Sequence, residues 1–396
     1  MRCAAAATVM VVVFGLLTSI EAQEMPPTLR TARPDPAFDW FATPAVYNAS
    51  AASVNAAPAT FEMAPPVEEP QIAPTKDFVG YGSPGVCPPC PHVYAWADAL
   101  YWHRIGTGCD DVLVTNTSLP PGADTVLRTS DLHFNGAGGF RVLVGWRPDP
   151  ACCPCCSAWE LSYWGLFGLN ANQTASSSAG TLAIPGDLGL ASNNFFLTNI
   201  LNINYQSQLN NVEFNCIKSC CLCCGNQIDF LCGFRYINLN ETLTITGTDF
   251  QEGTSNYNVH TDNNLYGFQM GGRYTKPWTD LWSIQLTAKS GLFWNDIHQT
   301  QVATDFPNNT APFALRDRVS TRGSAVAALG EMDFVFIRRI NDTWSLRLGY
   351  TVIGLGGVAL APDQLDFTNT FASGTQIHST GWIFVHGGLL GLQARW

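Results

Sequence analysis

The C-terminal stretch of the chain alternates between large apolar side chains and small or polar ones. Within GWIFVHGGLLGLQARW, one parity carries Trp382, Phe384, Leu390, Leu392, Ala394 and Trp396. The other parity carries Gly381, Gly387, Gly391, Gln393 and Arg395. A period of two residues indicates a β-strand. Aromatics on one face with glycines and an ion on the other are typical of a strand whose apolar face meets lipid.

The same alternation recurs along most of the chain after residue 90, as in GGFRVLVGWR, WELSYWGLFG and WSIQLTAKSGLFW. Such runs reach the roughly 9–11 residues that a tilted strand needs to cross a bilayer. The pattern predicts about ten strands, within a range of eight to twelve, at 93–103, 137–147, 158–168, 201–217, 227–239, 264–275, 282–295, 324–338, 344–356 and 380–396.

The segments between these strands are alternately short and long. RPDPACCPCCS, SCCLCCGN, TKPWTD and RINDT are short, and the other five are long, polar and rich in Asn, Thr, Gly and Asp. Outer-membrane barrels have this arrangement, with short periplasmic turns and long external loops. We therefore predict an all-β fold, a closed antiparallel up-and-down transmembrane β-barrel over residues 91–396. With ten strands, both ends of the chain fall on the periplasmic side. Aromatics near strand ends fit an interfacial girdle: Trp146, Trp159, Trp278, Trp282, Trp344 and Trp396.

Two strands fit this pattern poorly. Asp98 shares its parity with Trp96, Leu100 and Trp102, which leaves the direction of that face open. In 201–217 the polar parity shifts near Leu209, which predicts a bulge or a misplaced boundary.

The N-terminal region differs from the rest in composition. Arg2 followed by the apolar run from Ala4 to Leu17 and the small residue Ala22 predicts a secretory signal peptide over 1–22. Residues 23–90 are rich in Pro, Ala, Ser and Glu and show no apolar period. Such a segment buries too little apolar surface to offset its ordering entropy, so we expect a disordered periplasmic linker.

Net charge and cysteine content narrow the possible partners and chemistry. A net charge of −11 argues against nucleic acid as a partner. Ten cysteines lie in three groups that the topology places on the periplasmic rim: Cys87, Cys90, Cys152, Cys153, Cys155, Cys156, Cys220, Cys221, Cys223 and Cys224. In an oxidising compartment we expect disulfides between the groups, with a zinc or iron–sulfur site as the alternative. We expect no cofactor.

The sequence resembles the putative beta-barrel porin-7 family of bacterial outer-membrane proteins in the motifs WADALYWHR, GGFRVLVGWR, WELSYWGLFG, LCGFRYINL and the closing GGLLGLQARW. The resemblance covers roughly residues 93–396 and implies a porin-like barrel in the bacterial outer membrane, with no catalytic residue to transfer. Terminal aromatic strands resemble the assembly signal of such barrels, here Trp396. The expected partners are outer-membrane lipid, the barrel-assembly machinery, and small solutes or other envelope components.

Charged residues on the polar parity are predicted to line the interior, and their role is left open. They are Arg141, Arg147, Glu160, Asp229, Arg235, Arg273, Lys289, Glu331, Asp333 and Arg347, together with Arg395. One interpretation is an ion-paired plug in a closed structural barrel, because about eight strands leave an interior just filled by side chains. The other is a narrow pore whose basic excess favours small anions.

A third function is hydrolysis by histidines and aspartates on the external loops. The candidates are His103 with Asp110 and Asp111, His260 with Asp262, His298, and His378. They have no spacing motif, so we expect a protein that is not an enzyme.

Overall fold

The computed structural model describes residues 92–120, 124–147, 155–221, 226–251, 253–307 and 313–396. The predicted signal peptide 1–22 and linker 23–90 lie outside the described residues. So do Cys87, Cys90, Cys152, Cys153, Cys223 and Cys224. Among the helices of the described part, none has the length and apolar character needed to cross a membrane.

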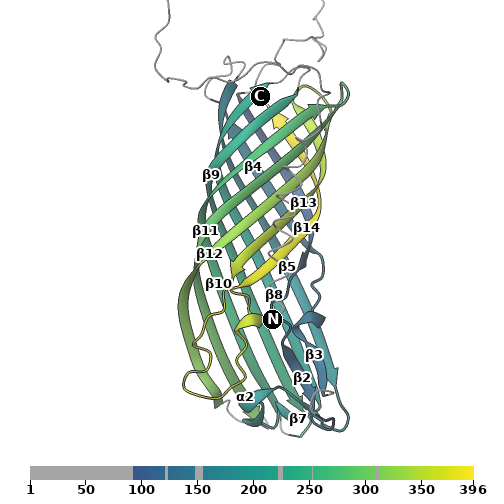
Figure 1. Cartoon of the computed structure of the whole chain (residues 1–396). Coiled ribbons are helices and arrows are strands. Elements are labelled where there is room, and N and C mark those ends of the chain that lie inside the picture. Colours follow the sequence, from purple (N-terminus) through teal and green to yellow (C-terminus); the bar gives the residue numbers. More distant parts are fainter. Residues whose placement is uncertain (1–91, 121–123, 148–154, 222–225, 252, 308–312) are drawn as a thin grey trace, which may run out of the picture. The chain divides into compact units, whose positions relative to one another are not determined.

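Within the described residues, ten antiparallel strands pair in chain order, and the first pairs with the last to close a barrel (Figure 1). All ten predicted strands are present, and the predicted fold class is confirmed. The strands are β1 (Val93–Ile105), β4 (Ala137–Trp146), β5 (Cys155–Ser176), β8 (Ile200–Cys221), β9 (Gln227–Asp249), β10 (Gly253–Pro277), β11 (Trp282–Pro307), β12 (Phe313–Arg339), β13 (Trp344–Val358) and β14 (Gly381–Arg395).

Two of the five predicted long loops are wrong. Residues 240–249, 253–263, 296–307 and 313–323 continue the barrel wall as the outer halves of β9 to β12, whose strands run for 23 to 27 residues. Their outward side chains are Thr, Asn and other polar residues, which makes the sequence resemble a loop. The alternation nevertheless persists, with the apolar residues now on the inner face.

The polarity of the wall inverts along β9. Phe230 and Phe234 point outward and are 59% and 43% exposed, whereas Thr242 and Thr244 share that face further along the strand. On the inner face the order is reversed, from Asp229 and Arg235 to the fully buried Leu243 and Ile245. An apolar outer face requires lipid and a polar one requires water. The apolar belt therefore ends near Asn238, and beyond it the wall extends into water.

The irregularity predicted near Leu209 lies on the neighbouring strand. β8 keeps one parity throughout, with Leu209, Asn211 and Glu213 all buried inside. The register between β5 and β8 shifts between Leu166 and Leu169, opposite Leu209. Gly168 adopts a positive φ of 81° there, a conformation that favours glycine. The shift of polarity in β8 thus marks the end of the lipid belt and not a bulge in that strand.

The remaining loops fill the outer part of the barrel. A second sheet has the order β3 (Thr125–Arg128), β2 (Val112–Asn116), β6 (Leu182–Ala183) and β7 (Phe196–Thr198). Together with α2 (Gly186–Leu190) it lies at the end of the barrel opposite to the C-terminus (Figure 1). Their apolar residues, including Leu113, Leu188 and Phe195, pack in one buried cluster with Leu243 and Ile245 of the wall.

Candidate functional site

The structure places the predicted interior residues inside the barrel at the level of the lipid belt. Nine of them are less than 9% exposed: Arg141, Arg147, Glu160, Asp229, Arg235, Arg273, Glu331, Asp333 and Arg347. The tenth, Lys289, has a side chain that is 11% exposed. Arg395 was predicted inside as well and is instead exposed, because it is the last residue of β14 and lies at the rim.

The predicted excess of basic residues inside is wrong, because two acidic residues were missed. Asp98 and Glu213 are both 2% exposed and ion-paired. Asp98 follows the parity of Trp96 and Trp102, which all point inward. With these two, the layer holds six acidic and six basic side chains: Asp98, Glu160, Glu213, Asp229, Glu331, Asp333, Arg141, Arg147, Arg235, Arg273, Lys289 and Arg347. The interior of this layer is formally neutral.

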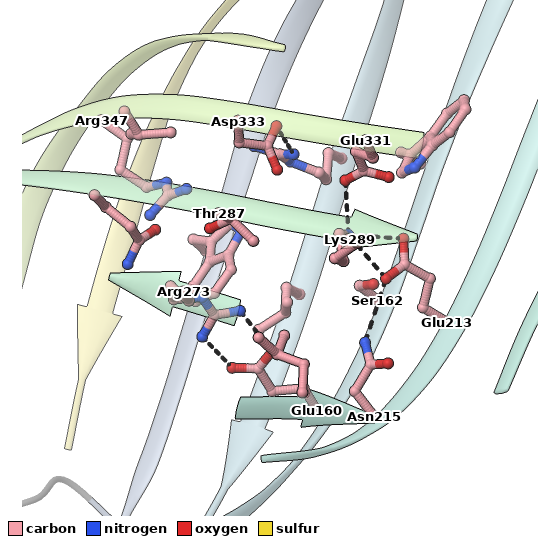
Figure 2. Close-up of a pocket in the computed structure, with 17 residues that line it drawn as sticks. Glu160, Ser162, Glu213, Asn215, Arg273, Thr287, Lys289, Glu331, Asp333 and Arg347 are labelled. Atoms are coloured by element: carbon pink, nitrogen blue, oxygen red, sulfur yellow. Dashed lines mark hydrogen bonds and ion pairs between the residues drawn. The ribbon is translucent and has the colours of Figure 1, made fainter. Parts of the chain in front are cut away.

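The first group of ion pairs is centred on Glu160 (Figure 2). Arg273 from β10 donates two parallel hydrogen bonds to it, Nη1 to Oε1 at 2.7 Å and Nη2 to Oε2 at 2.8 Å. The Tyr94 hydroxyl donates a third at 2.6 Å. Asp229 approaches Arg273 at 3.7 Å. Such two-point pairs combine charge with fixed geometry, and this one joins β10 to β5 across the interior.

The second group links Glu213, Lys289, Arg235 and Glu331. Lys289 Nζ lies 3.0 Å from Glu213 Oε2 and 2.7 Å from Glu331 Oε1. Arg235 Nη1 lies 2.7 Å from Glu331 and 3.5 Å from Glu213. Each cation thus contacts both carboxylates, so four strands are held together by one square of charges.

The third group holds the seam where the barrel closes. Asp98 on β1 accepts from Arg141 of β4 at 3.0 Å and from Arg347 of β13 at 3.1 Å. Arg141 also reaches Asp333 at 3.1 Å. Two guanidinium groups contact the Trp96 ring, with Arg347 at 4.5 Å and Arg273 at 5.4 Å from its centroid. Desolvated cation–π contacts of this kind add to the ion pairs.

Little free space remains between these side chains. The cavity lined by the charged residues measures about 30 Å³. A single water needs roughly 10–15 Å³ on this measure, so the cavity has room for about two or three water molecules.

An apolar layer covers the ion pairs on the side facing the external end. Along β9 the inner face passes from Arg235 to Ile237 and Leu239, both at most 1% exposed. Trp102, Trp164 and Phe293 join the same buried cluster from other strands. A hydrated ion would have to lose its water to pass this layer, which is costly without compensating ligands.

The loop between β13 and β14 forms a third obstruction. Asn263 exchanges hydrogen bonds with the backbone of Ala359 at 2.8 and 2.9 Å. Glu241, which is paired with Arg104 at 2.5 Å, accepts from the Ala361 N–H at 2.9 Å. Gln301 donates to the Gln364 carbonyl at 2.6 Å. Polar side chains on the inner wall therefore fix this loop inside the barrel.

Asp363 fastens the same loop to the segment after β1. Its Oδ1 accepts from the Cys109 N–H at 2.6 Å. Burial raises the pKa of the Asp363 carboxyl above its ordinary value, and the negative charges of Glu241 and Asp111 raise this pKa further, against the lowering effect of the Cys109 hydrogen bond.

Three of the candidate hydrolytic residues, His260, Asp262 and His298, lie near one another on the outer wall formed by β10 and β11. His260 points outward from β10 and contacts the Thr242 hydroxyl at 3.0 Å. Asp262 and His298 are register partners on the outer wall, where His298 contacts Ser320 at 2.9 Å. The remaining candidates lie elsewhere: His103 on β1, Asp110 in an exposed pair with Arg128, Asp111 after β1, and His378 in the loop before β14. None of these candidates lines the cavity among the interior ion pairs.

The cysteine groups are described only in part. Cys155 lies opposite Cys220 in the register of β5 and β8, so two of the groups meet at one end of the barrel. Cys156 and Cys221 lie on the same two strands. Among the described residues there is no group of three or more His, Cys, Asp or Glu side chains that could hold a metal ion. The disulfides and the alternative metal site stay predictions.

Comparison with known families identifies the barrel. A family model described as "Putative beta barrel porin-7" matches residues 94–380. The chain belongs to this family. Membership confirms the sequence-based resemblance and makes the protein a porin-like β-barrel of the bacterial outer membrane.

Solved structures similar to this porin-7 family member share little sequence with it. The outer-membrane protease OmpT from Escherichia coli has 9% identity and a TM-score of 0.40, over 77% of this chain and 96% of that one. The toluene transporter TodX from Pseudomonas putida has 8% identity and a TM-score of 0.32, over 78% and 91%. A major outer-membrane protein from Thermus thermophilus has 9% identity and a TM-score of 0.27, over 76% and 99%. No curated protein matches significantly.

Proposed function

We propose that this porin-family member is a closed structural barrel of the outer membrane that has no permanent pore. The balanced ion-pair layer is the observation that carries the proposal. Its six acidic and six basic side chains neutralise one another and leave a cavity of about 30 Å³. The apolar layer and the inserted loop support the same conclusion.

The alternative, a narrow pore that favours small anions, loses its main support. It rested on an excess of basic residues inside the barrel. Asp98 and Glu213 add two buried acidic side chains, and Arg395 is exposed at the rim, so the excess disappears. A mutually paired guanidinium also has fewer donors to offer a passing anion. We propose a non-catalytic role as well, because the family is one of porins and none of the candidate histidines lines the cavity inside the barrel.

We also retain two partners as proposals. The outward belt of Phe, Leu and Trp residues suits outer-membrane lipid. Trp396 is 61% exposed at the end of the closing strand, with its backbone N–H bonded to Val93 at 2.8 Å, a position that suits recognition by the barrel-assembly machinery.

Planar-bilayer recording tests the proposal. Purified full-length protein is inserted from proteoliposomes, and insertion is verified by flotation of the vesicles and by the different gel mobility of heated and unheated samples. We expect no current steps above the leak of protein-free bilayers, while a general porin prepared in parallel gives steps. Reproducible steps would overturn the proposal, and a reversal potential near that of chloride in a salt gradient would restore the anion pore.

A further inference from the structure

The outer wall beyond the lipid belt carries almost no charge on four adjacent strands. β5, β8, β9 and β10 are hydrogen-bonded neighbours in the barrel. Their outward positions beyond the belt are the even-numbered residues of 170–176, 200–210, 238–248 and 254–264. Each of these residues is Asn, Gln, Thr or Ser, except Ile200, His260 and Asp262. This part of the wall therefore has no Lys or Arg.

This composition differs from that of a surface that meets only water. Such surfaces commonly carry about 25–35% charged residues. Here the one carboxylate, Asp262, accepts hydrogen bonds from Asn238 at 2.6 Å and from Asn264 at 3.2 Å. Hydroxyls and carboxamides both donate and accept hydrogen bonds, and they lose less than ions do when they leave water. The wall therefore suits close contact with an uncharged partner rich in hydroxyl groups.

Four carboxamides on this wall are free to bind such a partner. Asn170 of β5 lies opposite Gln206 of β8, and Gln208 of β8 lies opposite Asn240 of β9. All four point outward, and their side chains have no hydrogen-bond partner among the described residues. Each carboxamide offers two N–H donors and one carbonyl acceptor. We call these four residues the carboxamide patch.

The height of the patch on the barrel indicates where its partner comes from. The apolar belt ends near Asn238, and Asn240 is the next outward residue of β9. Just inside the belt, the rings of Tyr236 and Tyr266 pack with their centroids 5.0 Å apart, as is typical of interfacial aromatics. The patch thus continues the lipid-facing surface at the level of the outer-leaflet headgroups. From Asn240 to Thr248 the wall extends for roughly 25 Å along the strand, at about 3.3 Å per residue.

The charge of the wall discriminates between kinds of headgroup. Phosphate is bound in proteins mainly by Arg and Lys, which these positions lack, and the carboxylate of Asp262 repels it. The hydroxyl groups of a sugar carry no charge and need both donors and acceptors, which carboxamides supply. The wall therefore complements an uncharged saccharide and not a phosphate.

We propose that the carboxamide patch binds the uncharged sugar headgroups of outer-leaflet glycolipids. The carboxamides bond the sugar hydroxyls, while Tyr236 and Tyr266 contact the junction between sugar and acyl chains. Sugar units further from the membrane follow the Thr and Asn residues of the wall. This inference rests on the proposed contact between the belt and outer-membrane lipid. It does not depend on whether the barrel conducts.

Native mass spectrometry of the full-length protein tests the preference. The protein is released from lauryldimethylamine oxide micelles that contain equal amounts of digalactosyldiacylglycerol, phosphatidylcholine and phosphatidylglycerol with the same acyl chains. We expect wild type to retain the galactolipid about fivefold over either phospholipid, which corresponds to the net contribution of one hydrogen bond.

Two triple variants locate the binding. Q206A/Q208A/N240A removes three carboxamides of the patch, and we expect the ratio to fall toward one. N135A/N369A/Q376A is the matched control, because it removes three exposed carboxamides from loops outside the wall and should keep the wild-type ratio. Folding of both variants is verified by the different gel mobility of heated and unheated samples.

Four results would overturn the inference. The first is equal retention of the three lipids by wild type, and the second is an unchanged preference in folded Q206A/Q208A/N240A. The third is displacement of the galactolipid by excess free galactobiose, which would assign the patch to soluble saccharide. The fourth is a protein dimer that only the patch variant loses, which would assign the face to a second copy.

Flotation with vesicles separates this inference from the proposed lipid contact. Failure of the protein to float would overturn the lipid contact and this inference with it. Floating protein without a preference for the galactolipid overturns the inference alone.

Discussion

Arg273 and Glu160 form a two-point ion pair inside the barrel, with Nη1–Oε1 and Nη2–Oε2 distances of 2.7 and 2.8 Å. The two side chains are 9% and 1% exposed and come from β10 and β5, which are not neighbours in the wall. The pair therefore spans the interior. A pair in this position resists opening of the barrel as well as slippage of its strands.

Removing one partner of this pair should destabilise the fold strongly. In Glu160→Gln, Arg273 stays buried and, among the described residues, keeps the Asp229 carboxylate at 3.7 Å as its remaining ion-pair partner. Breaking a buried pair in this way costs about 3–5 kcal/mol. Urea unfolding in detergent micelles, followed by tryptophan fluorescence, measures the free energy of unfolding. The control is Asp110→Asn in the exposed pair with Arg128, for which we expect a loss of about 0–1 kcal/mol. Equal losses would contradict a structural role for the interior pair.

The free-energy cost of an arginine on the outer face of β9 should depend on its depth in the membrane. Phe234→Arg places a cation in the apolar belt, which costs about 2–4 kcal/mol at the bilayer midplane. Thr244→Arg places the same side chain on the same face beyond the belt, where surface substitutions usually stay within about 0.5 kcal/mol. Unfolding in lipid vesicles compares the two. A large loss in Thr244→Arg would mean that the belt extends further than Asn238.

Alanine substitutions at two adjacent glycines on β14 should have very different effects on stability. A Cβ on Gly387 would lie 2.3 Å from the Tyr101 carbonyl oxygen and 2.6 Å from the Trp102 Cα, so the seam must shift. A Cβ on Gly388 points outward and meets nothing nearer than 4.0 Å. We expect Gly387→Ala to cost about 1–3 kcal/mol by overpacking and Gly388→Ala to be nearly neutral. The yield of folded barrel and its urea midpoint report both, and the prediction fails if the two variants behave alike.

Asp363 should make stability depend on pH. Burial raises its pKa in the folded state, so between the ordinary Asp pKa of about 3.9 and the raised value the folded protein binds more protons than the unfolded one. The contribution of Asp363 is therefore fully present below the ordinary pKa and is lost as pH rises through the raised one.

Asp363→Asn tests this dependence because the amide oxygen still accepts from the Cys109 N–H and carries no charge. We expect the unfolding midpoint of wild type, relative to the variant, to fall as pH increases through this window. Midpoints that stay parallel across the pH range would show that Asp363 titrates as it does in the unfolded chain.

The local alternation was enough to predict the barrel. Phe140, Val142 and Trp146 on one face with Arg141 and Arg147 on the other specify a strand between lipid and a polar interior, whatever its neighbours are. Ten such segments separated by short and long connections imply the closed topology. The pattern failed where the surroundings of the wall change: Thr242 and Thr244 are polar because water replaces lipid outside, so residues 240–263 resembled a loop although Leu243 and Ile245 kept the period.

What the sequence determined by itself was the presence of about ten membrane-crossing strands and, for most of them, which side chains face lipid, because a period of two depends only on the backbone. Only the tertiary structure decided which charges meet and whether they balance. Glu160 and Arg273 are 113 positions apart along the chain and belong to non-adjacent strands. Their pairing depends on the curvature and register of the whole barrel, which no local pattern contains.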